Sequence, residues 1–285
     1  MPLLKIIILA IVQGLAELLP VSSSAHVVVA EKLMGLDPSS PPMTLLLVML
    51  HTGTMFAVIA YFWKQWKATY FRSTDAFKRI AIRLIWATVL TAIVGEVIIK
   101  VIEKTILKDV PHAQIEDLFN HLEWVAPALA AAGVLILIAG LARRQQPREG
   151  KELTMNQSGI IGAVQGLCLP FRGFSRSGAT ISTGMLAGAA KERVEAFSFA
   201  LAVILTPPVV IREALRLRHA EHLSGGLNLA SAMVPGLLGA LFAFLAGLLA
   251  LKWLSRWLEG GRWYLFGIYC LVASGVVFYL HHLGY

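Results

Sequence analysis

Long apolar stretches dominate this sequence and limit the folds it can adopt. Hydrophobic residues make up 57% of its 285 residues, charged residues make up 15%, and the mean hydropathy is +0.70. A soluble domain carries about 25% charged residues, and a membrane-spanning helix needs about 20 apolar ones. Six stretches approach that length, at about 43–62, 80–102, 124–142, 194–214, 229–254 and 263–280. The sequence predicts an all-α polytopic protein with one membrane domain over 1–285.

Two further apolar segments are interrupted by proline, glycine and serine. The first covers 3–19, breaks at "PVSSSA" and continues over 26–35. The second covers 158–169, breaks at "PFRGFSRSG" and continues over 179–190. Each half is too short to span a membrane, and irregular backbone is tolerated at membrane depth where protein or a watery cavity surrounds it. Both segments are therefore predicted to be re-entrant helical hairpins.

The basic residues and a short repeat predict how the two hairpins are oriented. Fourteen Lys and Arg residues fall at 64–79, 143–151, 191–193 and 252–262, and eight fall in the segments assigned to the other side of the membrane. Because Lys and Arg are enriched in cytoplasmic loops, the segments with fourteen are predicted to be cytoplasmic. The first hairpin then enters from outside and the second from inside. The letters "VQGL" occur in both hairpins, at 12–15 and 164–167. We expect inverted repeats, about 1–142 and 152–285, an architecture common in transporters.

The first hairpin gathers an acid, hydroxyl groups and an imidazole. They belong to Glu17, Ser22, Ser23, Ser24 and His26. Gln13 lies four residues before Glu17 and therefore shares its helix face. A carboxylate in an apolar helix costs about 2.5–3.5 kcal/mol and usually marks a functional interior. Its presence, and the recurrence of the same design at 162–180, where no signal peptide can lie, argue against a cleaved signal peptide. In the purely structural alternative, the serines cap the second half-helix and His26 bonds a carbonyl.

The second hairpin supplies positive charge ahead of an apolar half-helix. Its polar and glycine residues are Arg172, Gly173, Ser175, Arg176, Ser177, Gly178 and Thr180. A helix N-terminus with hydroxyl groups and a guanidinium is an anion site, for which phosphate is a natural ligand. Two alternatives stay open: Arg176 only neutralises Glu17, and Arg172 extends to the surface.

If the hairpins meet, an acid and a base face a phosphate cradle inside a membrane protein. That combination suits cleavage of a lipid-linked phosphate ester or pyrophosphate. His51 either lines the same cavity or packs in the core. The net charge of +8 does not form one basic face, so no nucleic-acid partner is expected. The two cysteines predict neither a disulfide framework nor a metal cluster.

The two motifs together resemble those of the bacterial undecaprenyl-diphosphate phosphatases, the bacitracin-resistance family. The first motif is "QGLAELLPVSSSAH", and the second is "GFSRSGATIS". The resemblance extends over most of the chain, including "EAFSFALAV". Two positions depart from the family pattern. Gln13 stands where many members have glutamate, and Arg172 stands where they have proline.

The resemblance implies the activity and the residues that carry it. The family removes the terminal phosphate of undecaprenyl diphosphate, which recycles the lipid carrier for peptidoglycan synthesis and confers bacitracin resistance. The implied catalytic residues are Glu17, Ser23, His26 and Arg176. The residues expected to bind substrate phosphate are Gln13, Ser22, Gly173, Ser175, Ser177, Gly178 and Thr180. Magnesium or another divalent cation is implied, with Glu17 as the one clear carboxylate ligand.

The expected setting is the bacterial inner membrane, among membrane lipids, with the site facing the periplasmic side. A homodimer is one option for the assembly. The nucleophile stays open between Ser23, deprotonated by His26, and water activated by Glu17 or His26. The alternative function is a transporter or flippase for a polyprenyl phosphate lipid, because inverted repeats also serve transport.

Overall fold

Ten α-helices and no β-strand make up the described part of the computed structural model, which comprises residues 2–36, 41–105, 122–142, 152–224 and 229–284. The predicted basic loop at 143–151 lies outside these residues. In chain order, the helices are α1 (Leu3–Leu18), α2 (Ser23–Leu33), α3 (Pro41–Thr69), α4 (Thr74–Thr105), α5 (Leu122–Ala142), α6 (Met155–Cys168), α7 (Arg176–Leu186), α8 (Lys191–Ser224), α9 (Leu229–Glu259) and α10 (Trp263–His282).

The long helices are those of a multi-pass membrane protein. Five described helices are long and apolar enough to cross a membrane, with candidate spans in α3, α4, α5, α9 and α10. The sixth predicted span, at 194–214, falls within α8, a helix of 34 residues. That helix is about 51 Å long at 1.5 Å per residue, which exceeds the hydrocarbon thickness of a bilayer. Some of its side chains lie outside the described residues, which is why the five spans are not a count for the whole chain.

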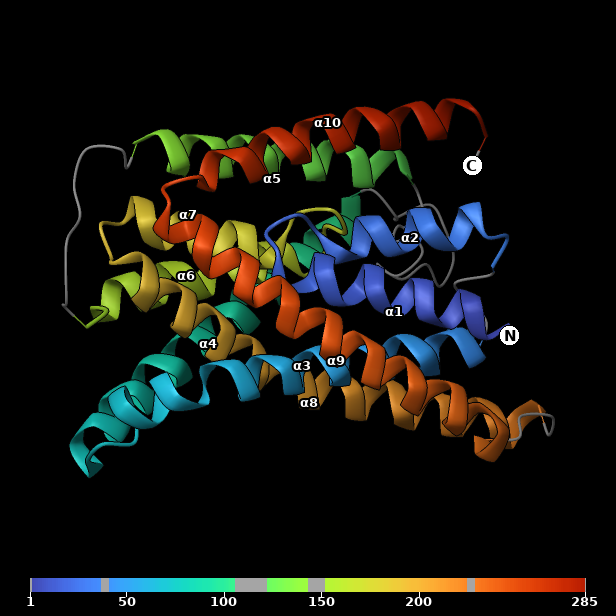
Figure 1. Ribbon diagram of the computed structural model, residues 1–285, viewed down its shortest axis with the longest axis horizontal. Helices are drawn as coiled ribbons and strands as arrows, with labels where there is room; N and C mark the ends of the chain where they lie inside the picture. The colour runs from blue at the N-terminus through green and yellow to red at the C-terminus, as the bar shows by residue number, and fades with distance from the viewer. Residues whose placement is uncertain (1, 37–40, 106–121, 143–151, 225–228, 285) are drawn as a thin grey trace.

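Both interrupted segments form pairs of short helices. The first helix of each pair ends two residues before a proline, α1 at Leu18 and α6 at Cys168, because proline cannot continue a helix. The second helix of each pair begins with a serine cap, from Ser22 in α2 and from Ser175 in α7. Figure 1 shows the two helix pairs approaching from opposite ends of the molecule, with their turns near its middle.

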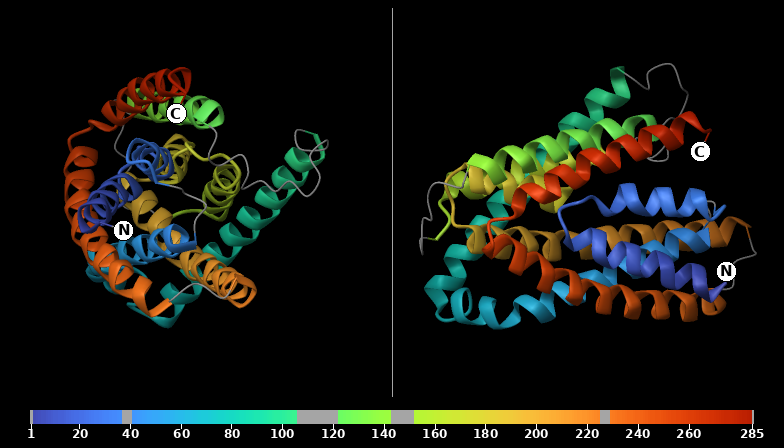
Figure 2. Two further views of the ribbon diagram at one scale, coloured as in Figure 1. Left: turned by 90° about the vertical axis from the view of Figure 1, so that its right-hand side faces the viewer. Right: turned by 45° about the horizontal axis from the view of Figure 1, so that its top comes forward.

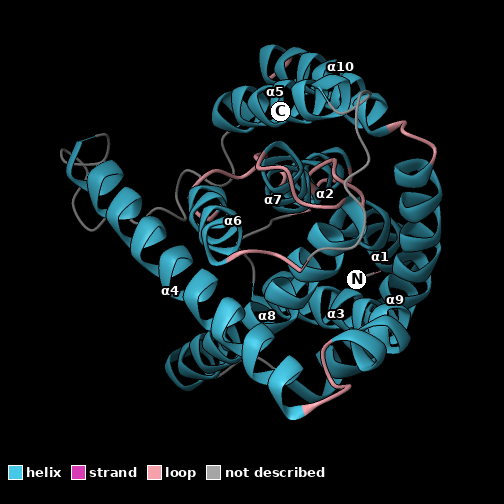
Figure 3. Cartoon of the chain, turned by 90° about the vertical axis from the view of Figure 1, so that its left-hand side faces the viewer, coloured by secondary structure: helices cyan, strands magenta, loops and turns pink. Residues whose placement is uncertain are grey.

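The other helices enclose these short helices. In the end-on views, α5 and α10 lie together on one side, α3, α8 and α9 lie on the other, and α4 leans outward (Figures 2 and 3). The enclosed helices carry the core, since Leu9, Val28 and Ile181 are fully buried. In contrast, α4 exposes apolar side chains such as Ile85, which is 64% exposed. A surface of this kind suits the hydrocarbon of a bilayer.

The repeated letters "VQGL" have a packing role. A Cβ atom added at Gly14 would lie 2.7 Å from the carbonyl oxygen of Ala243 in α9. A Cβ atom added at Gly166 would lie 2.7 Å from the carbonyl oxygen of Thr91 in α4. Both distances are too short for a real side chain, so each glycine permits close contact between a short helix and a long one.

Candidate active site

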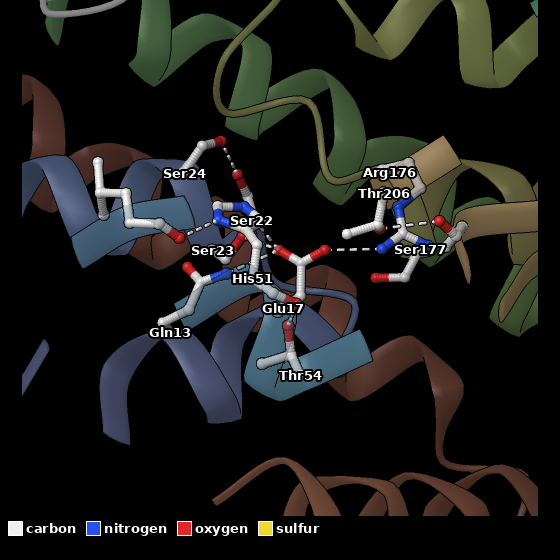
Figure 4. Close-up of polar contacts among 12 residues, drawn as sticks. Gln13, Glu17, Ser22, Ser23, Ser24, His51, Thr54, Arg176, Ser177 and Thr206 are labelled. Atoms are coloured by element: carbon white, nitrogen blue, oxygen red, sulfur yellow. Dashed lines mark hydrogen bonds and ion pairs between the residues drawn. The ribbon is translucent and has the colours of Figure 1, made fainter. Parts of the chain in front are cut away.

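Glu17 and Arg176 join the two helix pairs at their turns. Glu17 lies near the end of α1, and Arg176 is the first residue of α7. The Nη2 atom of Arg176 donates to Oε1 of Glu17 at 2.7 Å, and the two side chains are only 23% and 16% exposed. Figure 4 shows the carboxylate of Glu17 between this guanidinium and the residues of the first turn. The contact joins residues 159 positions apart in the chain and requires the hairpins to meet.

The second carboxylate oxygen of Glu17 faces Ser23. The hydroxyl of Ser23 donates to Oε2 at 2.5 Å, and Nε2 of Gln13 donates to the same oxygen at 3.3 Å. A carboxylate bonded to a serine hydroxyl is positioned to accept its proton. Gln13 lies on the same helix face as Glu17, as their spacing predicts, and adds a neutral donor to the carboxylate.

His51 also reaches Glu17 and belongs to the site. Its Nδ1 atom lies 2.8 Å from the carbonyl oxygen of Leu47, which can only accept, so Nδ1 carries the proton in this bond. Its Nε2 atom then faces Oε2 of Glu17 at 3.9 Å, and the side chain is 46% exposed. Of the two possibilities that the sequence left open for His51, the structure favours a place at the site.

His26 points away from Ser23. Its Nδ1 atom lies 2.7 Å from the carbonyl oxygen of Ser22, and its Nε2 atom lies 2.7 Å from the hydroxyl of Tyr269 in α10. The rings of His26 and Tyr269 are stacked, with centroids 5.6 Å apart. The hydrogen bond to the carbonyl of Ser22 is the one expected if His26 has a structural role. Both ring nitrogens are occupied, so the geometry places Glu17, and not His26, beside the hydroxyl of Ser23.

Hydrogen bonds between backbone groups and serine hydroxyls join the two turns. Ser22 has a φ of 69°, which is strained for a residue other than glycine, and Gly173 has a φ of 102°. The N–H of Gly173 donates to Oγ of Ser24 at 3.2 Å, and the hydroxyl of Ser177 donates to the carbonyl of Leu19 at 3.2 Å. Strained turns persist where the surrounding contacts hold them. These bonds keep the first turn against the second.

Most of the predicted phosphate-binding residues support the second turn from inside. Ser175, Ser177 and Thr180 are at most 3% exposed. The hydroxyl of Ser175 accepts the N–H of Gly178 at 3.2 Å, and the hydroxyl of Thr180 lies 2.6 Å from that of Ser198. These bonds hold the start of α7 in place, where the first N–H groups of a helix have no partner within it.

Arg176 retains a free donor at this helix start. Its Nη1 atom is buried and has no hydrogen-bond partner among the described residues. A buried donor without a partner is uncommon in folded proteins and often indicates a ligand. A guanidinium can hold a phosphate through two parallel bonds. Arg176 can therefore bind Glu17 and an oxyanion at the same time, so its role need not end with neutralising Glu17.

The departure at Arg172 is accompanied by a buried acid. Arg172 interacts electrostatically with Glu31 in α2. The side chain of Glu31 is fully buried, and neither of its carboxylate oxygens has a hydrogen-bond partner in the described part of the chain. Arg172 therefore favours the charged form of an acid of the first hairpin, and no local sequence pattern indicates this because the two residues are far apart in the chain.

The described residues do not form a ready metal site. They contain no group of three or more His, Cys, Asp or Glu side chains placed to hold an ion. Glu17, the one carboxylate expected to bind a metal, is bonded to Arg176 through one oxygen and to Ser23 through the other. Divalent magnesium needs several oxygen ligands in octahedral geometry, and these side chains do not supply them.

Comparison with known proteins agrees with the two motifs. The model of the family described as bacitracin resistance protein BacA matches residues 6–276. Undecaprenyl-diphosphatase 2 of Acinetobacter baylyi is 56% identical over 280 residues, which cover 97% of each chain. Undecaprenyl-diphosphatase 2 of Burkholderia thailandensis is 34% identical over 282 residues, which cover 96% of this chain and 95% of the relative. The chain belongs to the bacitracin resistance protein BacA family.

Proposed function

We propose that this protein hydrolyses undecaprenyl diphosphate to undecaprenyl phosphate and inorganic phosphate. The reaction recycles the lipid carrier for peptidoglycan and other envelope polymers and accounts for bacitracin resistance. The names of the relatives support the substrate. The observation that carries the proposal is Arg176, which binds Glu17 with Nη2 while its buried Nη1 has no partner among the described residues. This places an oxyanion donor beside the bonded Ser23–Glu17 pair.

In the favoured mechanism, Ser23 is the nucleophile. Its Oγ atom attacks the terminal phosphorus, and the bond from that phosphorus to the bridging oxygen breaks. Glu17 accepts the hydroxyl proton and passes it to the departing undecaprenyl phosphate. Arg176 and the N–H groups at the start of α7 stabilise the charge on the transferred phosphoryl oxygens. The product of this half-reaction is a phosphoserine at Ser23.

Water completes the cycle. It attacks the phosphoserine, Glu17 takes a proton from the water, and a proton returns to Oγ of Ser23 as inorganic phosphate leaves. His26 acts here as a positioning residue, because its bond to the carbonyl of Ser22 holds the strained turn that aims Ser23. In the competing mechanism, water attacks the substrate directly with Glu17 as base, and no phosphoserine forms.

The first experiment measures phosphate release from a polyprenyl diphosphate by the detergent-purified protein. Wild type is compared with Glu17→Ala and Arg176→Ala, each with and without magnesium. Glu96→Ala is the matched control, because Glu96 is an exposed carboxylate that pairs with Lys100 on α4. We expect loss of activity in the two site variants alone. A folded wild type that releases no phosphate in either condition would favour the polyprenyl phosphate flippase instead.

Rapid quenching separates the two nucleophiles. A substrate labelled in its terminal phosphate should leave acid-stable label on wild-type protein and none on Ser23→Ala. Ser23→Ala that hydrolyses substrate at the wild-type rate would rule out the phosphoserine mechanism and leave water as the nucleophile.

We propose that a divalent cation used in this reaction arrives with the substrate. The diphosphate carries enough oxygen atoms to be the main ligand, and the described side chains of the site do not. Magnesium bound in this way would neutralise part of the charge of the diphosphate before it enters the membrane protein.

We propose that the two halves of the chain are inverted repeats with re-entrant hairpins. Some contacts between helices support this, because they recur when α1–α5 are exchanged for α6–α10. Thus α1 packs on α9 as α6 packs on α4, and α1 packs on α2 as α6 packs on α7. The same exchange swaps α3 with α8 and α5 with α10, so the contact between the two members of each pair is kept. Equivalent contacts of this kind are expected of two copies of one unit related by a two-fold axis.

We further propose that the protein lies in the bacterial inner membrane, with the site open to the periplasmic side. Support comes from the predicted cytoplasmic bias of Lys and Arg, since the α3–α4 turn, the α9–α10 turn and the start of α6 lie at one end of the molecule (Figure 1). The N-terminus and the end of α2 lie at the other end, from which the first hairpin enters.

Cysteine labelling in intact cells tests this orientation. In a background without Cys168 and Cys270, Lys104→Cys should react with an impermeant reagent, and Lys78→Cys at the opposite end of α4 should react only after permeabilisation. The reverse pattern would overturn the orientation while leaving the hydrolase assignment unaffected.

A further inference from the structure

A cavity outside the candidate active site has several charged side chains in its lining. It occupies about 160 Å³ at the end of the molecule where α3 ends and α4, α6 and α8 begin, on the left of Figure 1. It is lined by Thr69, Tyr70, Arg72, Ala76, Ile80, Arg83, Glu152, Leu153 and Arg193. The catalytic proposal makes no use of this cavity.

The cavity has an excess of positive charge. Glu152 is the one acidic residue among the described residues that line it, and Arg83 contacts Glu152 at 3.0 Å. Glu152 is also bound from outside the cavity by Arg79 at 3.2 Å. Arg72 and Arg193 form no ion pair with any described residue, and both line the cavity. Among the described residues, two guanidinium groups therefore remain for an anion, and guanidinium forms strong paired bonds with phosphate.

Tyr70 adds a neutral donor to the same wall. Burial raises the pKa of Tyr70 to about 12, against a lowering by the nearby charges of Arg193 and Arg83. The phenol therefore keeps its proton at any physiological pH and can donate a hydrogen bond. The lining thus combines charged and neutral donors, which is the usual composition of a phosphate-binding site in a protein.

Exposed aromatic rings next to the cavity indicate the level of the membrane surface. Trp63, Phe71 and Phe77 are 51%, 51% and 49% exposed. They contact one another in a row, with centroids 6.0 Å apart for Trp63 and Phe71 and 5.7 Å apart for Phe71 and Phe77. Tryptophan is enriched where lipid headgroups meet hydrocarbon, and exposed Phe rings extend this apolar surface. Phe71 lies between Tyr70 and Arg72 in the chain, so the aromatic row borders the cavity.

We propose that this cavity binds the phosphate of an anionic phospholipid headgroup, with the acyl chains lying along the aromatic row. Free inorganic phosphate has the same oxyanion chemistry, but it would not use Trp63, Phe71 and Phe77. A lipid uses both the charges and the rings, and basic pockets between helix ends are known lipid sites. The bound lipid would brace the ends of α3, α4, α6 and α8 against one another.

Native mass spectrometry of the full-length, delipidated protein in detergent tests the proposal. The probes are dioleoylphosphatidylglycerol, dioleoylphosphatidylcholine and inorganic phosphate. Wild type should retain the phosphatidylglycerol more tightly than the phosphatidylcholine. The Arg72→Gln/Arg193→Gln variant should bind the phosphatidylglycerol about tenfold more weakly, since two charged contacts are lost.

The matched control is Lys252→Gln/Arg256→Gln, which removes two exposed cations from the same end of the molecule without touching the cavity. It should bind the phosphatidylglycerol as wild type does. Equal weakening in both double variants would overturn the proposal, because the attraction would then be general. Phosphate that binds wild type as tightly as the lipid would also overturn it, in favour of a free-anion site. The single variant Arg72→Gln, at an exposed position, repeats the test if the double variant unfolds.

Discussion

Three hydrogen bonds at the first turn determine which side chains lie together. Ser23 donates to Glu17 at 2.5 Å, and His26 is held between the carbonyl of Ser22 and the hydroxyl of Tyr269, at 2.7 Å each. The strained φ of Ser22 needs such support, because a non-glycine residue leaves that region unless its neighbours hold it. In the proposed mechanism, Ser23 and Glu17 are the reacting pair, and His26 with Tyr269 holds the turn that carries Ser23.

The first prediction concerns Tyr269. Tyr269→Phe removes the hydroxyl that bonds His26 but keeps the stacked ring. We expect kcat for phosphate release to fall about 5- to 10-fold, the effect of one hydrogen bond of about 1–1.5 kcal/mol, with KM little changed. Steady-state kinetics on the purified variant measure both quantities.

A double-mutant cycle shows whether Tyr269 acts through His26. Once His26→Ala is present, Tyr269→Phe should have no further effect on kcat, because contacting residues are not additive. Tyr279→Phe, at a position 62% exposed on the same helix, is the matched control and should leave kcat unchanged. Additive losses in the cycle would mean that Tyr269 supports the fold and does not position His26.

At the scale of helices, close contacts and charged links between elements fasten the short helices to the long ones. Gly14 brings α1 against α9, and Gly166 brings α6 against α4. The start of α6 is further bound to α4, because Glu152 accepts hydrogen bonds from Arg79 and Arg83. The two glycine contacts are related by the proposed repeat, which would account for the same four letters occurring twice.

The second prediction concerns these glycines. Gly14→Ala and Gly166→Ala should each lower stability by about 1–3 kcal/mol, the usual effect of overpacking. Thermal unfolding in detergent measures the loss. Gly275→Ala is the matched control, because a Cβ atom at Gly275 in α10 would meet nothing within 4 Å; it should be neutral or slightly stabilising. Equal effects in all three variants would refute a special role for the two contacts.

The third prediction concerns the Glu152 link and pH. Hydrogen bonds from Arg79, and then from Arg83, hold the pKa of Glu152 below its ordinary value of 4.5. A lowered pKa stabilises the folded state above pH 4.5, and this contribution is lost as the pH falls through the folded-state pKa. Glu152→Gln should therefore lower Tm at pH 7, by no more than about 3 °C because the group is exposed.

The difference in Tm between wild type and Glu152→Gln should shrink as the pH falls from 6 to 3. Glu192→Gln, another exposed acid at this end of the molecule, serves as the control and should show no such narrowing. A difference that stays constant down to pH 3 would show that the ion pair is not its cause.

At the scale of the whole molecule, the two hairpins meet in the middle of the enclosing helices, so Glu17 and Arg176 come together from the two halves of the chain. Neither half contains both the acid and the guanidinium. The proposed reaction therefore needs both halves in place.

The fourth prediction belongs to this scale and concerns metal. The described side chains form no magnesium site, so magnesium alone should not change the Tm of the substrate-free protein. Because the ion is proposed to arrive with the diphosphate, removing it with a chelator should lower kcat/KM for that substrate. Differential scanning fluorimetry and phosphate release measure the two effects. A magnesium-dependent rise in Tm without substrate, absent in Glu17→Gln, would instead establish a site on the protein.

The sequence by itself determined the class of protein and the places where the chain breaks. Apolar length predicts spanning helices, and proline with serine predicts where the short helices end and begin, because these effects act within a few residues. The same local reasoning identified Gln13, Glu17, Ser23 and Arg176 as candidate functional residues, because they are polar groups within apolar segments. Their catalytic roles stay predictions.

Only the tertiary structure decided which of these groups touch. His26 lies three residues after Ser23, yet it bonds Tyr269, 243 positions away, while Ser23 bonds Glu17. Helix spacing predicts neighbours on one helix face, but a turn with the φ of Ser22 redirects the side chains that follow it. The pairing of Arg176 with Glu17 likewise depends on two hairpins meeting, which long-range packing of the enclosing helices enforces and no local pattern encodes.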